Sequence, residues 1–359
     1  WQSRRDGRVE TANMPFNSSP STRKETCRSY NPVMKKNSDI ILLLLIPSML
    51  LCNVCNGADT LSNGYYFDTC PEAEGIIQRK MSEWFRNDST LAPSIIRLHF
   101  HDCAVRGCDG SVLLKHKGSE RAAEASKTLR GFEVIKDMKM ELEKQCPKTV
   151  SCADILSAAA RDATLLLGGP FWEVTFGRKD GRVSLAEEAD EYVPRGRENV
   201  SALIDLFESK LGLSVLDLVA LSGSHTIGRS TCSSYMYSRS PRLAAANPFS
   251  QRLKSVCSGG RKRKNRKRDA VYVDLDVSTP RIFDTQYYSN LPKQMGLLST
   301  DQKLYEDPRT APFVSVFSGQ PDLFFSQFSA SMVKLGNVVL PQLSTDAEVR
   351  LHCEFINSP

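Results

Sequence analysis

The sequence lacks any hydrophobic run long enough to cross a membrane. A membrane-spanning helix needs about 20 apolar residues, whereas the longest apolar run, Ile40–Leu51, is about a dozen residues long and contains Pro47. Lys35 and Lys36 precede this run, and small residues around Ala58 follow it. A basic start, a short apolar centre and a small-residue end are typical of a secretory signal peptide. The pattern therefore predicts export and not a membrane anchor.

The region before this run also lacks the patterning of a folded segment. Residues 1–33 are polar and show no apolar periodicity, whereas Met34 opens a signal of the form Met-Lys-Lys, with Met14 as a weaker candidate start. We therefore predict that residues 1–33 are a non-native upstream extension and that residues 34–57 are the signal peptide. Residues 58–359 are expected to form one folded domain.

After residue 57 the chain lacks the C-x2-C spacing of zinc sites, although the whole sequence has 11 cysteines. Cys27, Cys52 and Cys55 precede residue 58, which leaves an even number, eight. In an exported protein, eight cysteines predict four disulfides. The sequence alone allows roughly a hundred ways of pairing them.

No strong excess of one charge sign is present, since 47 basic residues stand against 41 acidic ones. That balance argues against nucleic acid as a partner. The exception is Arg261–Arg268, within the segment 259–269, which has seven positive charges in eight residues. Without this run and residues 1–57, 32 basic and 37 acidic residues remain. We predict that the segment is a solvated basic loop on an acidic body.

No repeat of fixed period occurs, and most apolar residues after residue 58 recur at helical spacing, which predicts a mainly α domain. Leu203–Leu211 is one such helical stretch. Gly168, Gly169 and Pro170 interrupt the pattern, and Phe171–Phe176 is a short β-prone stretch after them.

The segment Arg97–Cys103 reads Arg-Leu-His-Phe-His-Asp-Cys. On a helix, Arg97 and His101 are four residues apart and share one face, while His99 points away. A cation and a base would then point to the same place, which suits acid–base chemistry. Taken alone the pattern is weak, because a single helical Arg and His more often lie at the surface or in a satisfied core.

Further motifs give this pattern its context. Arg97–Cys103 is followed by Val105, Gly107, Cys108, Asp109 and Ser111, and Leu221–Gly228 reads Leu-Ser-Gly-Ser-His-Thr-Ile-Gly. Through these residues the sequence resembles the secreted plant (class III) haem peroxidases, from about Leu61 to Cys353. The resemblance implies a monomer with a mainly α, two-lobed fold, haem b between a distal and a proximal lobe, and four disulfides. It also implies reduction of hydrogen peroxide and one-electron oxidation of small phenolic donors, in cell-wall metabolism and the response to oxidative stress.

By this resemblance, His101 is the distal base that moves a proton between the two peroxide oxygens. Arg97 would stabilise the charge as the bond between them breaks, and Phe100 would shield the iron from other ligands. On the proximal side His225 would be the axial ligand of the iron. Asp301 would accept the second ring proton of His225 and make the ring more electron-donating.

The resemblance also implies two calcium ions. The first would be held by Asp102, Val105, Gly107, Asp109 and Ser111. The second would be held by Thr226, Asp276, Thr279, Ile282 through its carbonyl, and Asp284. Without the resemblance each loop fits a capped turn equally well, because its acid count is low.

The resemblance further implies a disulfide pairing and a donor site. The pairs would be Cys70 with Cys146, Cys103 with Cys108, Cys152 with Cys353, and Cys232 with Cys257. Pro194 matches a proline at the haem edge where flat phenols arrive, although a proline in an ordinary loop is the competing interpretation. Donors at an open edge need no deep pocket, which agrees with a broad range of phenols.

One loop departs from the family pattern. Glu120 matches the acid of the distal hydrogen-bond chain, but Ser126 stands where the family usually has the asparagine that accepts the other ring proton of His101. Glu124 and Ala125 replace the usual prolines. We expect His101 to be less firmly oriented and less basic as a result, and the protein to be a slow but real peroxidase.

The basic run Arg261–Arg268 is longer than the family pattern predicts at that loop. We expect it to bind a polyanion, with demethylated wall pectin as the specific hypothesis. A pectin-binding wall protein with weak catalysis is the alternative function, although the intact distal and proximal residues speak against it. Sequons at Asn87 and Asn199 would be exposed to glycosylation on a secretory route to the cell wall or apoplast.

Overall fold

The structure is a computed structural model that describes residues 61–238, 248–259, 271–338 and 347–358. The predicted upstream extension, the signal peptide and the basic run Arg261–Arg268 lie outside the described residues. The fold is 57% helix and 5% strand, which confirms the prediction of a mainly α domain. No described helix has both the length and the apolar character needed to span a membrane.

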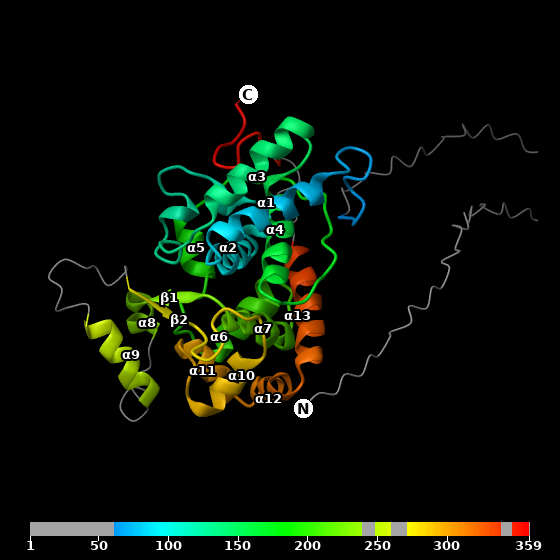
Figure 1. The fold of residues 1–359 in the computed structure, drawn as a ribbon. Helices are drawn as coiled ribbons and strands as arrows, with labels where there is room; N and C mark the ends of the chain where they lie inside the picture. The colour runs from blue at the N-terminus through cyan, green and yellow to red at the C-terminus, as the bar shows by residue number, and fades with distance from the viewer. Residues whose placement is uncertain (1–60, 239–247, 260–270, 339–346, 359) are drawn as a thin grey trace, which may run out of the picture. The chain divides into compact units, whose positions relative to one another are not determined.

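The α-helices occur throughout the described chain (Figure 1). In order they are α1 (Ala73–Asn87), α2 (Leu91–Arg106), α3 (Phe132–Gln145), α4 (Cys152–Leu166), α5 (Ala186–Tyr192), α6 (Val200–Asp205), α7 (Val215–Ser222), α8 (Cys232–Ser238), α9 (Pro248–Gly259), α10 (Gln286–Asn290), α11 (Ser299–Glu306), α12 (Ala311–Gly319) and α13 (Pro321–Gly336). Short 3-10 turns at Ser111–Leu113, Glu120–Ala122, Gly223–Thr226 and Leu291–Lys293 connect them. The helix predicted at Leu203–Leu211 is confirmed, since α6 continues into a π-helical turn, Leu206–Lys210.

The first group of helices packs around α4. Both α1 and α2 lie against α4, and α3 packs against α1 and α4. The helix α4 begins at Ser151, whose hydroxyl accepts a hydrogen bond from the backbone N–H of Asp154 (3.1 Å). Nearly every residue of α4 is buried, and its five alanines let the neighbouring helices approach closely. The helix α2, which carries Arg97–Cys103, is thereby fixed against a rigid core.

The second group contains α6, α7, α10, α11, α12 and α13. The helix α7 begins with a capping box, in which Asp217 Oδ2 accepts the backbone N–H of Ser214 (2.9 Å) and Ser214 Oγ accepts the backbone N–H of Asp217 (3.3 Å). The rings of Phe283, Phe324 and Phe328 pack together with centroids 4.8–5.8 Å apart. The helix α13 contacts both α7 and α2 and so joins the two groups, which share one hydrophobic core.

Regular strands are few in the described part of the chain. They are β1 (Arg229–Thr231) and β2 (Tyr272–Asp274), which pair antiparallel. The prediction of β structure at Phe171–Phe176 is wrong, because this extended segment forms only one bridge, from Phe176 to Ser62. Alternate side chains from Trp172 onward are buried against the core. The residue types of this segment favour β structure, but a ladder also needs a neighbouring strand, and none runs along this segment among the described residues.

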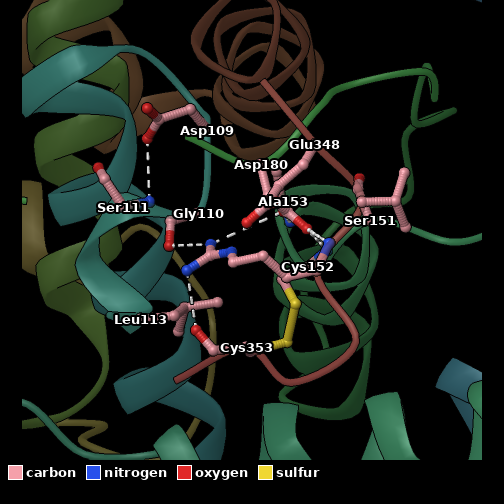
Figure 2. Close-up of polar contacts among 12 residues, drawn as sticks. Asp109, Gly110, Ser111, Leu113, Ser151, Cys152, Ala153, Asp180, Glu348 and Cys353 are labelled. Atoms are coloured by element: carbon pink, nitrogen blue, oxygen red, sulfur yellow. Dashed lines mark hydrogen bonds and ion pairs between the residues drawn. A yellow bond between two sulfur atoms is a disulfide. The ribbon is translucent and has the colours of Figure 1, made fainter. Parts of the chain in front are cut away.

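Four disulfides cross-link the domain. They join Cys70 to Cys146, Cys103 to Cys108, Cys152 to Cys353, and Cys232 to Cys257, which are the pairs that the family resemblance implies. Cys152 and Cys353 are 201 residues apart, and their bond ties the C-terminal segment to the start of α4 (Figure 2). Closing so long a loop restricts the unfolded chain and is typically worth about 2–4 kcal/mol.

A buried ion pair reinforces this tie. The guanidinium of Arg350 is fully buried and donates to the carbonyls of Gly110 (2.5 Å) and Cys353 (2.8 Å). It lies 3.7 Å from the carboxylate of Asp180. Asp180 in turn accepts hydrogen bonds from the first two N–H groups of α4 (3.1 and 2.9 Å) (Figure 2). The C-terminal segment is therefore bonded directly to the loop at Gly110.

Candidate active site

The helix α2 presents two chemically different faces. Arg97 and His101 line one large cavity, whereas His99 is buried on the other side, beside Arg178 and Cys103. Burial, helped by the charge of Arg178, lowers the pKa of His99 to about 3, so this ring is a neutral core residue. The prediction that Arg97 and His101 share one face of the helix while His99 points away is therefore confirmed.

The cavity has a volume of about 1280 Å³ and is lined by residues of both helix groups. His101 of α2 and His225, which follows α7, both line it, so two imidazoles border one space. Apolar side chains that include Phe100, Phe207 and Leu221 line much of the remaining wall. Ordinary small-molecule pockets measure roughly 300–1,000 Å³, so this cavity has room for a large organic cofactor.

His101 is buried, and its protonation is disfavoured. Burial and, after it, the positive charge of Arg97 lower the pKa of His101 well below its usual value. The ring is therefore a neutral base at neutral pH. Its Nδ1 atom is buried and has no hydrogen-bond partner among the described residues.

Ser126 does not supply that partner. Its side chain is buried, but its hydroxyl too has no partner within the described chain, and Ser126 does not line the cavity. The neighbouring Ala125 does line it, and the carbonyl of Ala125 accepts a hydrogen bond from Arg97 Nη2 (3.0 Å). Arg97 Nη1 donates to Thr128 Oγ1 (2.9 Å). The loop therefore orients Arg97 and leaves the orientation of His101 to other contacts.

Phe100 forms an apolar wall next to His101. Its ring stacks on that of Phe207, with centroids 6.3 Å apart, and meets the ring of His101 edge to face at 6.4 Å. All three residues line the cavity. This wall keeps the surroundings of the base apolar.

His225 is held by a buried carboxylate. Its Nδ1 lies 2.8 Å from Asp301 Oδ1, and Asp301 Oδ2 accepts the backbone N–H of Leu298 (3.0 Å). The hydroxyl of Tyr287 donates to the same Oδ1 atom (3.2 Å). Because Nδ1 donates its proton to Asp301, Nε2 of His225 keeps a lone pair and is the nitrogen that can bind a metal.

The first predicted cation set gathers around the end of α2. Its members are Asp102 and Val105 in the last turns, then Gly107, Asp109 and Ser111 in the loop that follows, where Asp109 accepts the Ser111 N–H (2.9 Å) (Figure 2). Asp109 Oδ2, Ser111 Oγ and Glu120 Oε2 are buried without a hydrogen-bond partner among the described residues. Burial, with the charge of Asp109 adding to it, raises the pKa of Asp102 well above its usual range. A bound divalent cation would relieve this repulsion.

Glu120 belongs to the same buried cluster. Its Oε1 accepts a hydrogen bond from Ser184 Oγ (3.1 Å), and burial raises its pKa to about 8. No described contact joins Glu120 directly to His101 or Ser126. The structure therefore places the predicted distal acid beside the first cation set.

The second predicted cation set follows His225 and continues in the segment after β2. Its members are Thr226, Asp276, Thr279, Ile282 and Asp284. Thr226 Oγ1 donates to Asp284 Oδ1 (2.9 Å), and Asp276 Oδ1 accepts the N–H of Thr279 (3.1 Å). Asp276 Oδ2 and Thr279 Oγ1 are buried without partners in the described chain, and burial, together with the charge of Asp284, raises the pKa of Asp276. This donor set also suits a hard cation.

Pro194 and the two sequons have distinct settings. Pro194 lines the cavity, next to Arg195 and Gly196. Asn87 is the last residue of α1, and Asn199 is the N-cap of α6; both are exposed. Both sequons are therefore open to modification on the folded domain.

Sequence reasoning missed three residues of this region. Tyr287 reaches Asp301 from α10, Ala125 positions Arg97 through its backbone, and Tyr237 lines the cavity opposite Arg195. The contact made by Ala125 has no sequence signal, because any residue has a carbonyl. Tyr237 and Tyr287 resemble ordinary core or surface tyrosines in the sequence, and only the tertiary fold brings them to the site.

Comparisons with known proteins agree with this geometry. A sequence model of the family described as Peroxidase matches residues 77–320. The chain is 49% identical over 300 residues to Peroxidase 7 of Arabidopsis thaliana, which covers 83% of this chain and 85% of the relative. It is 41% identical to Peroxidase 17 of the same plant, over 87% and 95% of the two chains. It is 39% identical to the lignin-forming anionic peroxidase of Nicotiana tabacum, over 83% and 93%.

Proposed function

The chain belongs to the peroxidase family, and on that premise we propose that it is a secreted, monomeric enzyme of the cell wall or apoplast that oxidises small phenols with hydrogen peroxide. One peroxide molecule takes two electrons and two protons and becomes two waters, while two phenols each lose one electron and one proton. Cell-wall metabolism and the response to oxidative stress are the processes that such a reaction would serve.

Family membership implies a haem cofactor, and we propose one haem b in the cavity. Three observations support the fit: the volume of about 1280 Å³, the apolar lining, and the lone pair left on Nε2 of His225. When bound, haem supplies an iron at which the peroxide bond is cleaved and the two oxidising equivalents are held. His225 would be its protein ligand.

On the proximal side the residues would keep His225 electron-rich. Asp301 accepts the Nδ1 proton (2.8 Å), which fixes the tautomer and the orientation of the ring. Tyr287 donates to the same carboxylate oxygen (3.2 Å), and this hydrogen bond would reduce the negative charge that the oxygen presents to His225. The strength of the ligand would therefore be set by two groups that compete for one oxygen atom.

On the distal side the residues would move protons. His101, neutral because its pKa is low, would take the proton from the peroxide oxygen nearer the metal and return it to the departing oxygen. Arg97, held by Ala125 and Thr128, would stabilise the negative charge that develops on the departing oxygen. Phe100 would exclude other ligands from the space beside His101, and Pro194 would border the edge where phenols meet the cofactor.

We also propose two calcium ions at the two cation sets. Unpartnered buried oxygens in both sets support this, namely those of Asp109 and Ser111 in the first and of Asp276 and Thr279 in the second. The first set begins in the same helical turn as His101, and the second begins at Thr226, next to His225. Each ion would brace one histidine.

The observation that carries the proposal is the pair of histidines in one cavity, one bonded to a carboxylate and the other kept neutral beside an arginine. The test is the Soret spectrum of the secreted, haem-loaded protein before and after one equivalent of hydrogen peroxide, followed by guaiacol. We expect the spectrum to change with peroxide and to return on adding the phenol. Bound haem whose spectrum does not respond to peroxide would contradict the proposal.

The alternative of a catalytically weak wall protein is not favoured by the comparisons. Pectin binding through Arg261–Arg268 is a separate proposal, supported by seven positive charges in eight residues. We expect salt-sensitive retention of the protein on immobilised polygalacturonate. Retention that is insensitive to salt, or unchanged when the run is replaced by glutamines, would refute this proposal.

A further inference from the structure

The cavity that Pro194 lines has more basic than acidic side chains. Among the described residues the cavity is lined by six basic side chains, Arg97, Lys127, Arg130, Arg195, Arg229 and Arg281, and by three acidic ones, Glu124, Asp274 and Asp301. Asp301 is already bonded to His225, Arg130 is paired with Asp88, and Lys127 is paired with Glu124. Among the described lining residues, Arg195, Arg229 and Arg281 therefore form no ion pair shorter than 4.0 Å, although Asp274 lies opposite Arg229 in the register of β1 and β2.

Arg195 shows this most clearly. Its guanidinium carbon lies over the ring of Tyr237, 4.4 Å from the centroid, and that of Arg197 lies over the same ring at 4.1 Å. The closest carboxylate to Arg195 is that of Glu124, at 4.0 Å, and Glu124 is 53% exposed. Such a contact contributes little. The N–H edge of the stacked guanidinium thus remains open to a ligand.

The loop that carries Arg195 is rigidly held. The carboxylate of Glu198 accepts the backbone N–H groups of residues 195, 196 and 197, each at 2.9 Å, so it does not neutralise their side chains. Lys303 of α11 donates to the carbonyls of Arg197 and Glu198 (2.8 and 2.9 Å). A ligand that pairs with Arg195 would therefore meet a preorganised group.

Arg229 repeats this arrangement on the two-stranded sheet. Its guanidinium carbon lies over the ring of Tyr272, 4.9 Å from the centroid, across the β1–β2 pair. Arg229 forms no ion pair with a residue that the structure describes, although Asp274 is its direct cross-strand partner. We call Arg195, Arg229, Tyr237 and Tyr272 the donor rim; all four line the same cavity as Pro194.

We propose that the donor rim selects phenols that carry a carboxylate, of the hydroxycinnamic acid class, over neutral phenols; this rests on the function proposed above. A planar guanidinium stacked on a ring is well suited to pair with a carboxylate through two parallel hydrogen bonds. The tyrosine rings and Pro194 offer apolar surface to the phenol ring of the same molecule. A neutral phenol would use only that second contact.

The test compares two donors that differ only in the charged group, 4-hydroxycinnamic acid and 4-hydroxycinnamyl alcohol. Each is titrated by calorimetry into the resting, haem-loaded protein without peroxide. In the unaltered protein we expect the acid to bind about tenfold more tightly, because a charge-assisted hydrogen bond contributes about 1.5–3 kcal/mol and tenfold corresponds to about 1.4 kcal/mol. Raising the salt concentration should reduce this preference.

Substitutions of Arg195 and Arg229 test whether these two residues cause the preference for the acid. In the double variant Arg195→Gln, Arg229→Gln we expect the acid and the alcohol to bind equally, with the affinity for the alcohol unchanged. The matched control is Arg86→Gln, at the exposed end of α1, which should leave the preference intact. Equal binding of the two donors to the unaltered protein, or a preference that survives in the double variant, would overturn the proposal.

Two further outcomes separate the possible failures. The carboxylates of haem itself have the same chemistry as the donor acid. If the double variant loses haem on dialysis and binds both donors more weakly, the arginines hold the cofactor and the proposal is wrong. If the unaltered protein oxidises guaiacol but shows no preference for the acid, the rim proposal fails and the peroxidase function stands. If guaiacol is not oxidised at all, the proposed function fails.

Discussion

The two histidines of the cavity are held in opposite ways. His225 has a carboxylate on Nδ1, and that carboxylate is itself bonded to Tyr287 and to a backbone N–H. Nδ1 of His101 has no hydrogen-bond partner among the described residues. The ring of His101 is buried, meets the ring of Phe100 edge to face, and lies near the positive charge of Arg97. The proximal ring is fixed by hydrogen bonds, whereas the distal ring is kept neutral by its environment.

The difference between the two histidines matches the two roles proposed for them. A metal ligand must keep one tautomer and one direction, and a carboxylate fixes both. A base that gives its proton back must not bind the proton too tightly, and desolvation beside a cation achieves this. The five changes that follow would break or sharpen this contrast.

Removing the distal base should have the largest effect. In His101→Leu the proton can no longer be moved between the peroxide oxygens, so we expect the rate of the first reaction with peroxide to fall by about 10²–10⁴-fold. Stopped-flow absorbance of the haem-loaded protein measures this rate. The resting spectrum should not change, because His225 and its partners are untouched. A loss of less than tenfold would contradict the role of His101.

Releasing the proximal ring should have the next largest effect. In Asp301→Asn the charge on the partner of Nδ1 is lost, and we expect about a 10–100-fold loss of activity or haem affinity together with a higher reduction potential of the iron. Spectroelectrochemistry measures the potential. Glu306→Gln, at the exposed last residue of the same helix, is the matched control. An unchanged potential in Asp301→Asn would refute the ligand-tuning role.

The environment of His101 should be visible in the pH profile of the peroxide reaction. Since burial and Arg97 lower the pKa of His101 well below its usual value, the base stays deprotonated and the rate should hold as pH falls through 6.5, declining only at lower pH. In Arg97→Leu the pKa rises, so the decline should begin at higher pH. A profile whose midpoint does not move would contradict this account.

A hydrogen-bond acceptor for Nδ1 of His101 should make the distal histidine more like His225. We expect Ala125→Asn to increase the rate of the first reaction with peroxide by about 2–10-fold, the equivalent of one hydrogen bond, because Ala125 lines the cavity with His101. Ser126→Asn is the companion variant at the position that the family pattern indicates; because Ser126 does not line the cavity, we expect a smaller increase there. If stopped-flow rates are unchanged in both variants, the missing partner does not limit catalysis.

The smallest effect is expected from Tyr287→Phe. Removing the hydroxyl leaves the whole charge of Asp301 Oδ1 to His225, which strengthens the ligand and should lower the reduction potential. One hydrogen bond, about 0.5–1.5 kcal/mol, sets an upper limit of roughly 60 mV for a one-electron couple. A merely structural tyrosine would change the melting temperature and leave the potential where it was.

Local motifs predicted most of the distal side, and tertiary contacts account for what they missed. The helical spacing correctly predicted that Arg97 and His101 share one face of α2 and that His99 points away from it, because these directions follow from helix geometry. The contact of Glu120 with Ser184 and the unpartnered hydroxyl of Ser126 within the described chain were not predictable, since they depend on how a loop folds over α2. Tyr287 reaches Asp301 only after α10 has packed against its neighbours. Phe171–Phe176 shows the opposite error, in which β-prone residues suggested a strand, but the segment forms only one bridge, to Ser62.

The buried Arg350 has a consequence for how the protein is made. Its guanidinium supplies the hydrogen bond to the carbonyl of Gly110, which the ribosome has produced 240 residues earlier, and Cys353 closes onto Cys152 across 201 residues. At typical synthesis rates of about 5–20 residues per second, the early helices are therefore synthesised many seconds before Arg350. The domain can be completed only after Arg350 and Cys353 have been synthesised and a thiol oxidant is available to close the Cys152–Cys353 bond.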